Sequence, residues 1–331
     1  MRNRRRVVIR TLLLLVGVGL LAIFIWSAGP QEIANNVARI GWGFGWLLLI
    51  SLVWRSLAAT GMWLLFEPHH GMSWWKIMLI RWAGEAVNTL MPFGNVGGEP
   101  VKAVLLSREL GGAESAGFVL LDKTIFFIGS ILFMTSGTLI GAVLLADHVE
   151  VLIGTIALLV PWVGLLGWAV WRQAKGDFVV KVSRVLALVR IKLSDKTIQK
   201  LERVDDTVSN FWRKQKGRFF LALTVHAIAR LLRVADVWVC VYLLGEHIEW
   251  TGAYFTAAAG MLVSSTFFFI PGALGASEGG HGFVFKLIGL GVTAGVTVGL
   301  VRRIRNYILS AIGYAIFVGW PSEQRSDPQE A

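Results

Sequence analysis

The sequence has 331 residues, a mean hydropathy of +0.63 and only 16% charged residues, an apolar surplus that a water-soluble fold cannot bury. The net charge of +11 would suit a nucleic-acid partner. However, the basic residues gather at the ends of apolar stretches, which is typical of membrane proteins, so we expect no nucleic acid. A single cysteine, Cys240, excludes a disulfide framework and a cysteine-based metal site.

The first apolar stretch, residues 9–26, follows a run of arginines, as a signal peptide does. The run from residue 11 to 26 is longer than the usual ~7–15-residue apolar region, and no small-residue cleavage site follows it. We therefore expect a retained first helix, with the arginine-rich N-terminus in the cytoplasm.

Several apolar stretches reach the ~20 residues that cross a bilayer. The expected spans are 9–26, 46–65, 117–145, 151–170, 219–244 and 304–320, and segments 74–110 and 251–290 are interrupted by Pro and Gly. We expect one transmembrane domain, 1–331: a first helix with an outer loop (1–42), a first repeat (43–146), a connecting span with a basic amphipathic segment (147–218), a second repeat (219–320) and a polar tail (321–331).

The segment 173–218 carries twelve Lys or Arg residues against five Asp or Glu residues, which places it on the cytoplasmic side. Its apolar residues recur at helical spacing between the charges, so we expect it to lie along the membrane surface. A regulatory or partner-docking helix is the alternative.

The sequence aligns weakly with itself at an offset of 179 residues. Identities are few, but the matches include residues that hydrocarbon disfavours. The offset pairs Pro92 with Pro271, Glu99 with Glu278, Lys102 with His281, and Lys123 with Arg302. Matching Pro/Gly-broken segments predict a transporter of two repeats. If each broken segment is a re-entrant helical hairpin, the two hairpins enter the membrane from opposite sides. The fold we expect is therefore an all-α polytopic membrane protein with two inverted repeats, whose breaks meet near the midplane and line one cavity.

The first broken segment begins with a polar stripe, since Arg81, Glu85, Asn88 and Pro92 lie four, three and four residues apart. Ionisable residues inside a membrane normally face a cavity and mark a transport pathway. Arg81 and Glu85 are spaced to neutralise each other.

The break itself contains Pro92, Gly94, Gly97 and Gly98. Unwound backbone at membrane depth occurs where it is buried in protein or lines water, so a site is implied. The helix that restarts here would direct its amides at an anion such as phosphate, with Glu99 and Lys102 in its first turn. The alternative is that Glu99 only caps that helix.

The second broken segment has the same plan, with Pro271, Gly272 and Gly275 ahead of Glu278 and His281. Histidine titrates near neutral pH, so His281 is a candidate proton-exchanging group. A hydrogen-bonded structural role is the equal alternative.

Further charges fall inside apolar sequence. Arg55 lies deep in the second span, where we expect Asp122, Glu85 or Glu99 to pair with it, and Lys123 lies beside Asp122. Arg230 and Arg233 share a helix face with His226 and Asp236. This basic stripe is a candidate site, and the alternative is that its arginines snorkel to the membrane interface. Arg302, Arg303 and Arg305 would begin the last span, and we expect them to face an internal polar cavity.

The order of these motifs resembles the lysylphosphatidylglycerol synthase transmembrane, or flippase-like, family. The resemblance rests on the break before Glu99-Pro100-x-Lys102, the Asp122-Lys123 pair, the run from Ile270 to Glu278 and an arginine-bearing last helix. Residues 81–99 are closest to the hopanoid-associated branch. The chain departs from the family at Ala273, often Gly there, and in the order of Asp122 and Lys123. The resemblance implies a multi-pass protein of the bacterial inner membrane that moves lipids between leaflets, without an aminoacyl-transferase domain.

We therefore expect a lipid flippase-like transporter of a lipid or a lipid-linked anionic or amphiphilic headgroup, with proton linkage through Glu99 and Glu278. Phospholipids, isoprenoid phosphates and hopanoids stay open as partners, and we expect no cofactor, metal or catalytic residue. A membrane-embedded enzyme acting on lipid phosphates, with arginines binding the phosphate and a carboxylate as general base, is the alternative. A non-transporting scaffold for lipid synthesis is another.

Overall fold

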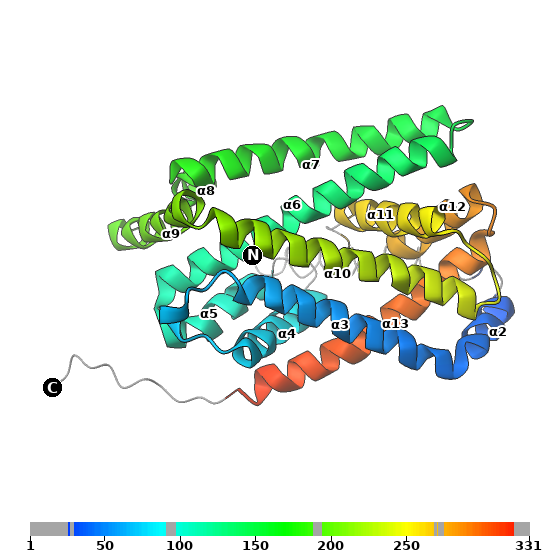
Figure 1. Ribbon diagram of the computed structural model, residues 1–331, viewed down its shortest axis with the longest axis horizontal. Helices are drawn as coiled ribbons and strands as arrows, with labels where there is room; N and C mark the ends of the chain where they lie inside the picture. Colours follow the sequence, from blue (N-terminus) through cyan, green and yellow to red (C-terminus); the bar gives the residue numbers. More distant parts are fainter. Residues whose placement is uncertain are drawn as a thin grey trace, which may run out of the picture.

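The structure is a computed structural model that describes residues 26, 30–90, 97–187, 194–267, 270 and 275–320. Within these ranges the chain is helical and contains no strand (Figure 1), which confirms the predicted all-α class. The expected first span, 9–26, lies outside the described residues except for Trp26.

The helices fall into three groups along the chain. The first comprises α2 (Pro30–Ile40), α3 (Phe44–Trp63), α4 (Trp74–Leu90), α5 (Gly98–Leu110) and α6 (Gly112–Leu144), with short 3-10 turns at Gly41–Gly43 and Pro68–His70. The second comprises α7 (Val149–Lys175), α8 (Phe178–Ala187) and α9 (Asp195–Lys214). The third comprises α10 (Lys216–Leu243), α11 (Trp250–Thr266), α12 (Ala276–Leu287) and α13 (Val292–Val318).

Three helical stretches are long and apolar enough to cross a membrane, namely Ile33–Trp63, Gly112–Leu144 and Val149–Lys175. The spans predicted at 46–65, 117–145 and 151–170 fall on them. Helices α10 and α13 have 28 and 27 residues, or roughly 40 Å at ~1.5 Å per residue, but both carry several charged side chains.

The last helix, which contains the predicted last span, begins earlier than residue 304. Helix α13 starts at Val292 rather than at residue 304, so Arg302 and Arg305 lie in the middle of a long helix. The arginines lowered the mean hydropathy around them, so the predicted span left out the first part of α13. The expectation that these arginines begin the last helix is therefore wrong.

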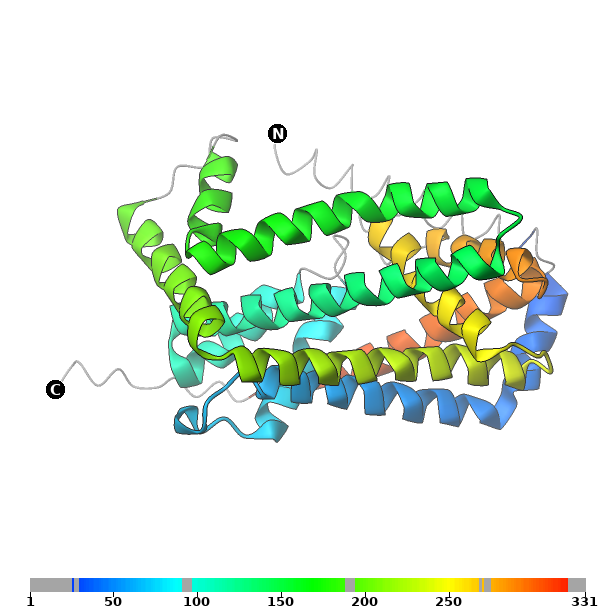
Figure 2. The ribbon, with the colours of Figure 1, turned by 45° about the horizontal axis from the view of Figure 1, so that its top comes forward.

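The first and third helix groups have matching plans. Adding 179 to the bounds of α4, α5 and α6 gives 253–269, 277–289 and 291–323, close to the bounds of α11, α12 and α13. Helices α3 and α10 pack side by side and run in opposite directions, with α5 near one end of the molecule and α12 near the other (Figures 1 and 2). Across the groups, α4 packs on α13 and α6 on α11.

The basic segment forms two helices, α8 and α9, at the α5 end of the molecule (Figure 2). Asp205 joins them, because its carboxylate accepts hydrogen bonds from the backbone N–H groups of Val179 (2.8 Å) and Val180 (3.0 Å) in the first turn of α8. Burial raises the pKa of Asp205 above its ordinary value, although these two hydrogen bonds oppose the shift. A position along the membrane surface stays a prediction.

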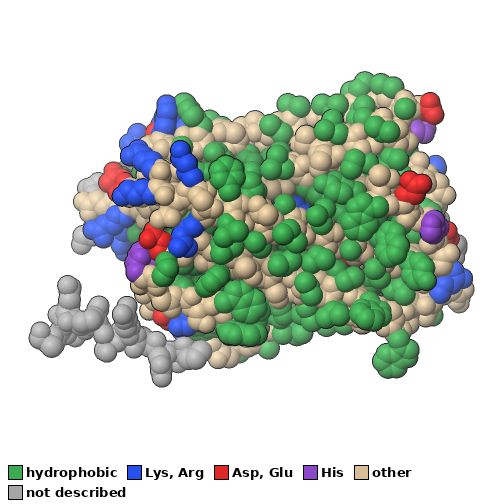
Figure 3. All heavy atoms as spheres, in the orientation of Figure 1, with side chains coloured by type: hydrophobic (Ala, Val, Ile, Leu, Met, Phe, Trp, Pro, Cys, Tyr) green, Lys and Arg blue, Asp and Glu red, His purple; other side chains and the backbone are tan. Residues whose placement is uncertain are grey.

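The outer surface of the molecule separates charge from apolar area. Figure 3 shows hydrophobic side chains spread over the long face, whereas Lys and Arg gather at the end that carries α8 and α9. Helix α7 contributes exposed apolar residues such as Ile153, Val160 and Leu165 to this surface. An apolar belt with basic residues at one end is the pattern of a protein embedded in a bilayer.

Candidate functional site

Asp122 of α6 is the centre of a buried network that we call the first cluster. Its members are Arg55, Arg81, Glu85, Glu99, Lys102, Asp122, Lys123 and His226. The Asp122 side chain is 2% exposed and accepts a hydrogen bond from Arg81 Nη1 at 2.5 Å. Lys102 Nζ lies 3.7 Å from the same carboxylate, and His226 Nε2 lies 3.5 Å from its other oxygen. One carboxylate thus holds groups from α4, α5 and α10.

Glu85 bridges two arginines at the edge of this cluster. Its Oε1 lies 3.2 Å from Arg81 Nε within α4, as the four-residue spacing predicted, and its Oε2 pairs with Arg55 Nη1 of α3. Among the three candidate partners for Arg55, the structure selects Glu85. An arginine deep in a membrane span is tolerated when such a partner neutralises it.

Glu99 lies in the first turn of α5 between two lysines. Its carboxylate oxygens lie 2.5 Å from Lys102 Nζ and 3.0 Å from Lys123 Nζ. The N-cap residue of α5, Gly97, has no side-chain capping bond, and the described contacts of Glu99 are these ion pairs. Glu99 therefore acts mainly as a charge that ties α5 to α6, and not as a simple helix cap.

Asn88 and Gly98 join α4 to α5. The backbone N–H of Gly98 donates to Asn88 Oδ1 at 2.6 Å, which satisfies an amide at the start of α5. A Cβ atom on Gly98 would lie 1.9 Å from the carbonyl oxygen of Gly84, so no larger residue fits here without displacing a helix. This close approach brings Lys102 alongside α4 and within reach of Asp122.

Glu278 of α12 is the centre of the second cluster, which comprises Asp236, Glu278, His281, Arg302, Arg303 and Arg305. Its side chain is fully buried and binds Arg303 through two contacts, from Nε at 2.6 Å and from Nη2 at 2.9 Å. The N–H of Gly275 also donates to Glu278 Oε2 at 3.0 Å, so this glutamate caps α12 as well. Gly275 has a positive φ of 73°, which favours glycine at this helix start.

His281 has its proton fixed on Nδ1. Nδ1 lies 2.6 Å from the carbonyl oxygen of Ser277, which only accepts, so Nδ1 donates. Nε2 lies 2.7 Å from Arg302 Nη1, which only donates, so Nε2 accepts. The geometry describes a neutral, hydrogen-bonded imidazole, which favours the structural alternative for His281 in this conformation.

Asp236 joins α10 to α13 in the second cluster. It pairs with Arg305, and its other oxygen lies 3.9 Å from Arg302 Nε. Arg302 and Arg305 thus contact protein groups, and the polar cavity expected beside them stays a prediction. The first cluster contacts α13 beside the second one, where Arg55 Nη2 donates to Asn306 Oδ1 at 3.4 Å.

Arg230 and Arg233 lie on α10 between the clusters. Arg230 is 4% exposed and donates to the carbonyl oxygens of His226 (2.9 Å) and Phe126 (2.5 Å) and to Ser130 Oγ (2.6 Å). Arg233 lies 5.3 Å from the ring centroid of Trp54. These contacts are inside the helix bundle, so interfacial snorkelling is wrong for Arg230.

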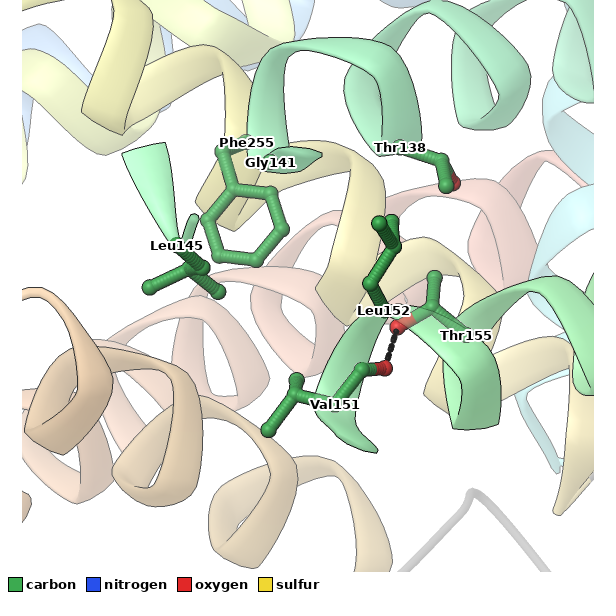
Figure 4. A pocket seen from close by; sticks show the side chains of 7 residues that line it. All are labelled: Thr138, Gly141, Leu145, Val151, Leu152, Thr155 and Phe255. Atoms are coloured by element: carbon green, nitrogen blue, oxygen red, sulfur yellow. Dashed lines mark hydrogen bonds between the residues drawn. The ribbon is translucent and has the colours of Figure 1, made fainter. Parts of the chain in front are cut away.

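The break residues Pro92, Gly94, Pro271 and Gly272 lie outside the described residues, so a shared cavity between the breaks stays a prediction. A small pocket does occur among α6, α7 and α11, where Phe255 and Leu145 face Thr155 (Figure 4). Thr155 donates its hydroxyl to the carbonyl oxygen of Val151. This pocket is lined by apolar residues and two threonines, and it belongs to neither cluster.

Three cluster members were not among the predicted site residues: His226, Asp236 and Arg303. His226 and Asp236 carried a signal, because both share the polar stripe of α10 with Arg230 and Arg233. The sequence signal for Arg303 was weaker. The offset of 179 residues points to its neighbour Arg302, and only the rotation of α13 shows which arginine meets Glu278.

Long apolar helices around a buried ion-pair network define an integral, polytopic helical membrane protein. Across residues 11–313 the chain matches the sequence model of the lysylphosphatidylglycerol synthase TM region, and it belongs to that family. No curated protein and no solved structure matched the chain in the corresponding searches. Membership in this family is consistent with a lipid-related function in the membrane.

Proposed function

We propose that this protein is a flippase-like transporter that moves a lipid or lipid-linked headgroup between the two leaflets. The observation that carries the proposal is the pair of buried glutamates at equivalent places. Glu99 is held by Lys102 and Lys123 at the start of α5, and Glu278 is held by Arg303 at the start of α12. Each carboxylate thereby ties a short broken-segment helix to a long one.

We infer that the two helix groups are inverted repeats with re-entrant hairpins. The matching bounds and the opposite directions of α3 and α10 support this inference. In such a fold, two equivalent helix ends approach the site from opposite faces of the membrane. Release of the Glu99 contacts would open one face, and release of the Glu278 contacts would open the other.

Proton linkage gives a physical reason for using carboxylates here. A proton on Glu99 or Glu278 removes the charge that attracts the neighbouring cation, which weakens the contact without changing the shape of the side chain. The substrate headgroup could act in the same way, by competing for the cations. We place the protein in the bacterial inner membrane with its basic end in the cytoplasm, in line with the positive-inside rule.

The test is translocation of a labelled lipid by purified protein in liposomes, followed by mass analysis of that lipid. We expect the label to cross between leaflets with its mass unchanged, and protein-free liposomes to show the slow background rate. A changed lipid mass would instead identify a membrane-embedded enzyme. No translocation of phospholipid, isoprenoid phosphate or hopanoid, with folded protein present, would contradict transport.

A further inference from the structure

The two clusters, taken together with Arg230 and Arg233 of α10, hold more positive than negative charge. The carboxylates are Glu85, Glu99, Asp122, Asp236 and Glu278, and the cations are Arg55, Arg81, Lys102, Lys123, Arg230, Arg233, Arg302, Arg303 and Arg305. All five carboxylates lie within 4 Å of one or more of these cations. Seven of these nine cations share the five carboxylates. The other two are Arg230 and Arg233, because no carboxylate among the described residues lies within ion-pair distance of either.

Arg230 is held by neutral groups only. Two of its acceptors are helix carbonyl oxygens and the third is a serine hydroxyl, so its charge is solvated but not neutralised. Its Nε atom is buried without a hydrogen-bond partner among the described residues. A buried unpaired cation costs several kcal/mol in a membrane protein, and such a residue is retained at functional positions.

Arg233 lies one helical turn further along α10. Its guanidinium packs on the Trp54 ring, and the nearby charges are those of Arg302, Arg230 and Arg305, opposed by Asp236. Asp236 already pairs with Arg305. Arg230 in turn lies within the field of Arg81 on α4. Arg230 and Arg233 therefore lie between like charges of the first cluster and of the second.

We infer that Arg230 and Arg233 bind the phosphate of a lipid phosphomonoester between the two clusters. This inference rests on the proposed transport function and names its substrate class. Guanidinium groups suit phosphate because their planar N–H fork matches its oxygens. An excess of several positive charges favours a phosphomonoester, which carries close to two negative charges at neutral pH, over a carboxylate with one. The anion would relieve the repulsion between the arginines.

The test measures thermal unfolding of the full chain in detergent with three additives: phosphatidic acid, diacylglycerol with the same acyl chains, and inorganic phosphate. Phosphatidic acid should raise the unfolding midpoint of the wild type, whereas diacylglycerol should not. In Arg233→Gln and Arg230→Gln the apparent Kd for phosphatidic acid should rise by about tenfold, the order expected when a charge-assisted hydrogen bond is lost. Arg213→Gln is the matched control, because Arg213 is exposed at the end of α9.

Folding and binding are separable in this design. Without lipid, Arg233→Gln should unfold at the same temperature as the wild type or higher, because the substitution removes unneutralised charge. Equal stabilisation by phosphatidic acid and diacylglycerol, or an unchanged Kd in both variants, would overturn the phosphate site. Stabilisation by inorganic phosphate alone would support the arginine site but assign it to a soluble anion, which contradicts the lipid headgroup. Phosphatidic acid binding without translocation would support the site and reject only transport.

Discussion

Replacement of Asp122 by asparagine should lower the free energy of unfolding by about 3–5 kcal/mol, the range seen when one partner of a buried ion pair is removed. Asparagine keeps the shape of the side chain but removes the charge that faces Arg81 and Lys102. Both cations are nearly inaccessible to solvent, so water cannot replace the lost carboxylate. The measurement is reversible unfolding in mixed detergent micelles.

The control for Asp122→Asn is Asp206→Asn, because Asp206 is exposed on α9 and its loss should change stability by no more than about 0.5 kcal/mol. Combining Asp122→Asn with Arg81→Gln should cost less than the sum of the two single changes, because each single change already removes the Arg81–Asp122 contact. If Asp122→Asn matches the control, the carboxylate is not the centre of the first cluster.

Replacement of Glu99 or Glu278 by glutamine should reduce lipid translocation in liposomes at least tenfold, about the effect of losing one charge-assisted contact. Glutamine preserves size and can still accept the Gly275 N–H at the start of α12, but it neither titrates nor attracts Lys123 or Arg303. We therefore expect the remaining transport to lose its dependence on pH. Glu150→Gln, at the exposed start of α7, should behave as the wild type.

Expression and thermal stability must be measured alongside these glutamine variants. Some loss of stability is expected for Glu278→Gln, because Arg303 loses a buried two-contact partner. Near-normal translocation with an unchanged pH profile in both variants would eliminate the proton-linked role and leave the glutamates as architecture.

The sequence predicted those features that depend on local spacing or on hydropathy. The Arg81–Glu85 pair follows from two residues four apart on one helix, and α3, α6 and α7 follow from long apolar runs. The sequence placed Lys102 in the same helical turn as Glu99, but it did not determine which cations pair with Glu99. Lys102 is three residues away on the same helix, whereas Lys123 reaches Glu99 from α6.

The sequence did not determine which distant segments pack together. The Arg81–Asp122 contact needs α4 to pack beside α6, and the Arg55–Asn306 contact joins α3 to α13. Hydropathy also failed where buried charges are neutralised by partners, since Arg302 and Arg305 made the first half of α13 look unsuitable for a membrane. A hydropathy window treats a paired arginine and a lipid-exposed one alike, although their free energies differ by several kcal/mol.

Hydrogen–deuterium exchange of the α5 and α12 amides tests most directly whether the two glutamate contacts close opposite faces of one transport site. Lys123→Gln weakens the Glu99 contact, and Arg303→Gln removes the Glu278 contact. If the contacts alternate, each variant shifts one shared equilibrium. Exchange in Lys123→Gln should then be faster in α5 and slower in α12 than in the wild type. Arg303→Gln should show slower exchange in α5 and faster exchange in α12. Faster exchange confined in each variant to its own helix, with the other helix unchanged, would contradict alternating access.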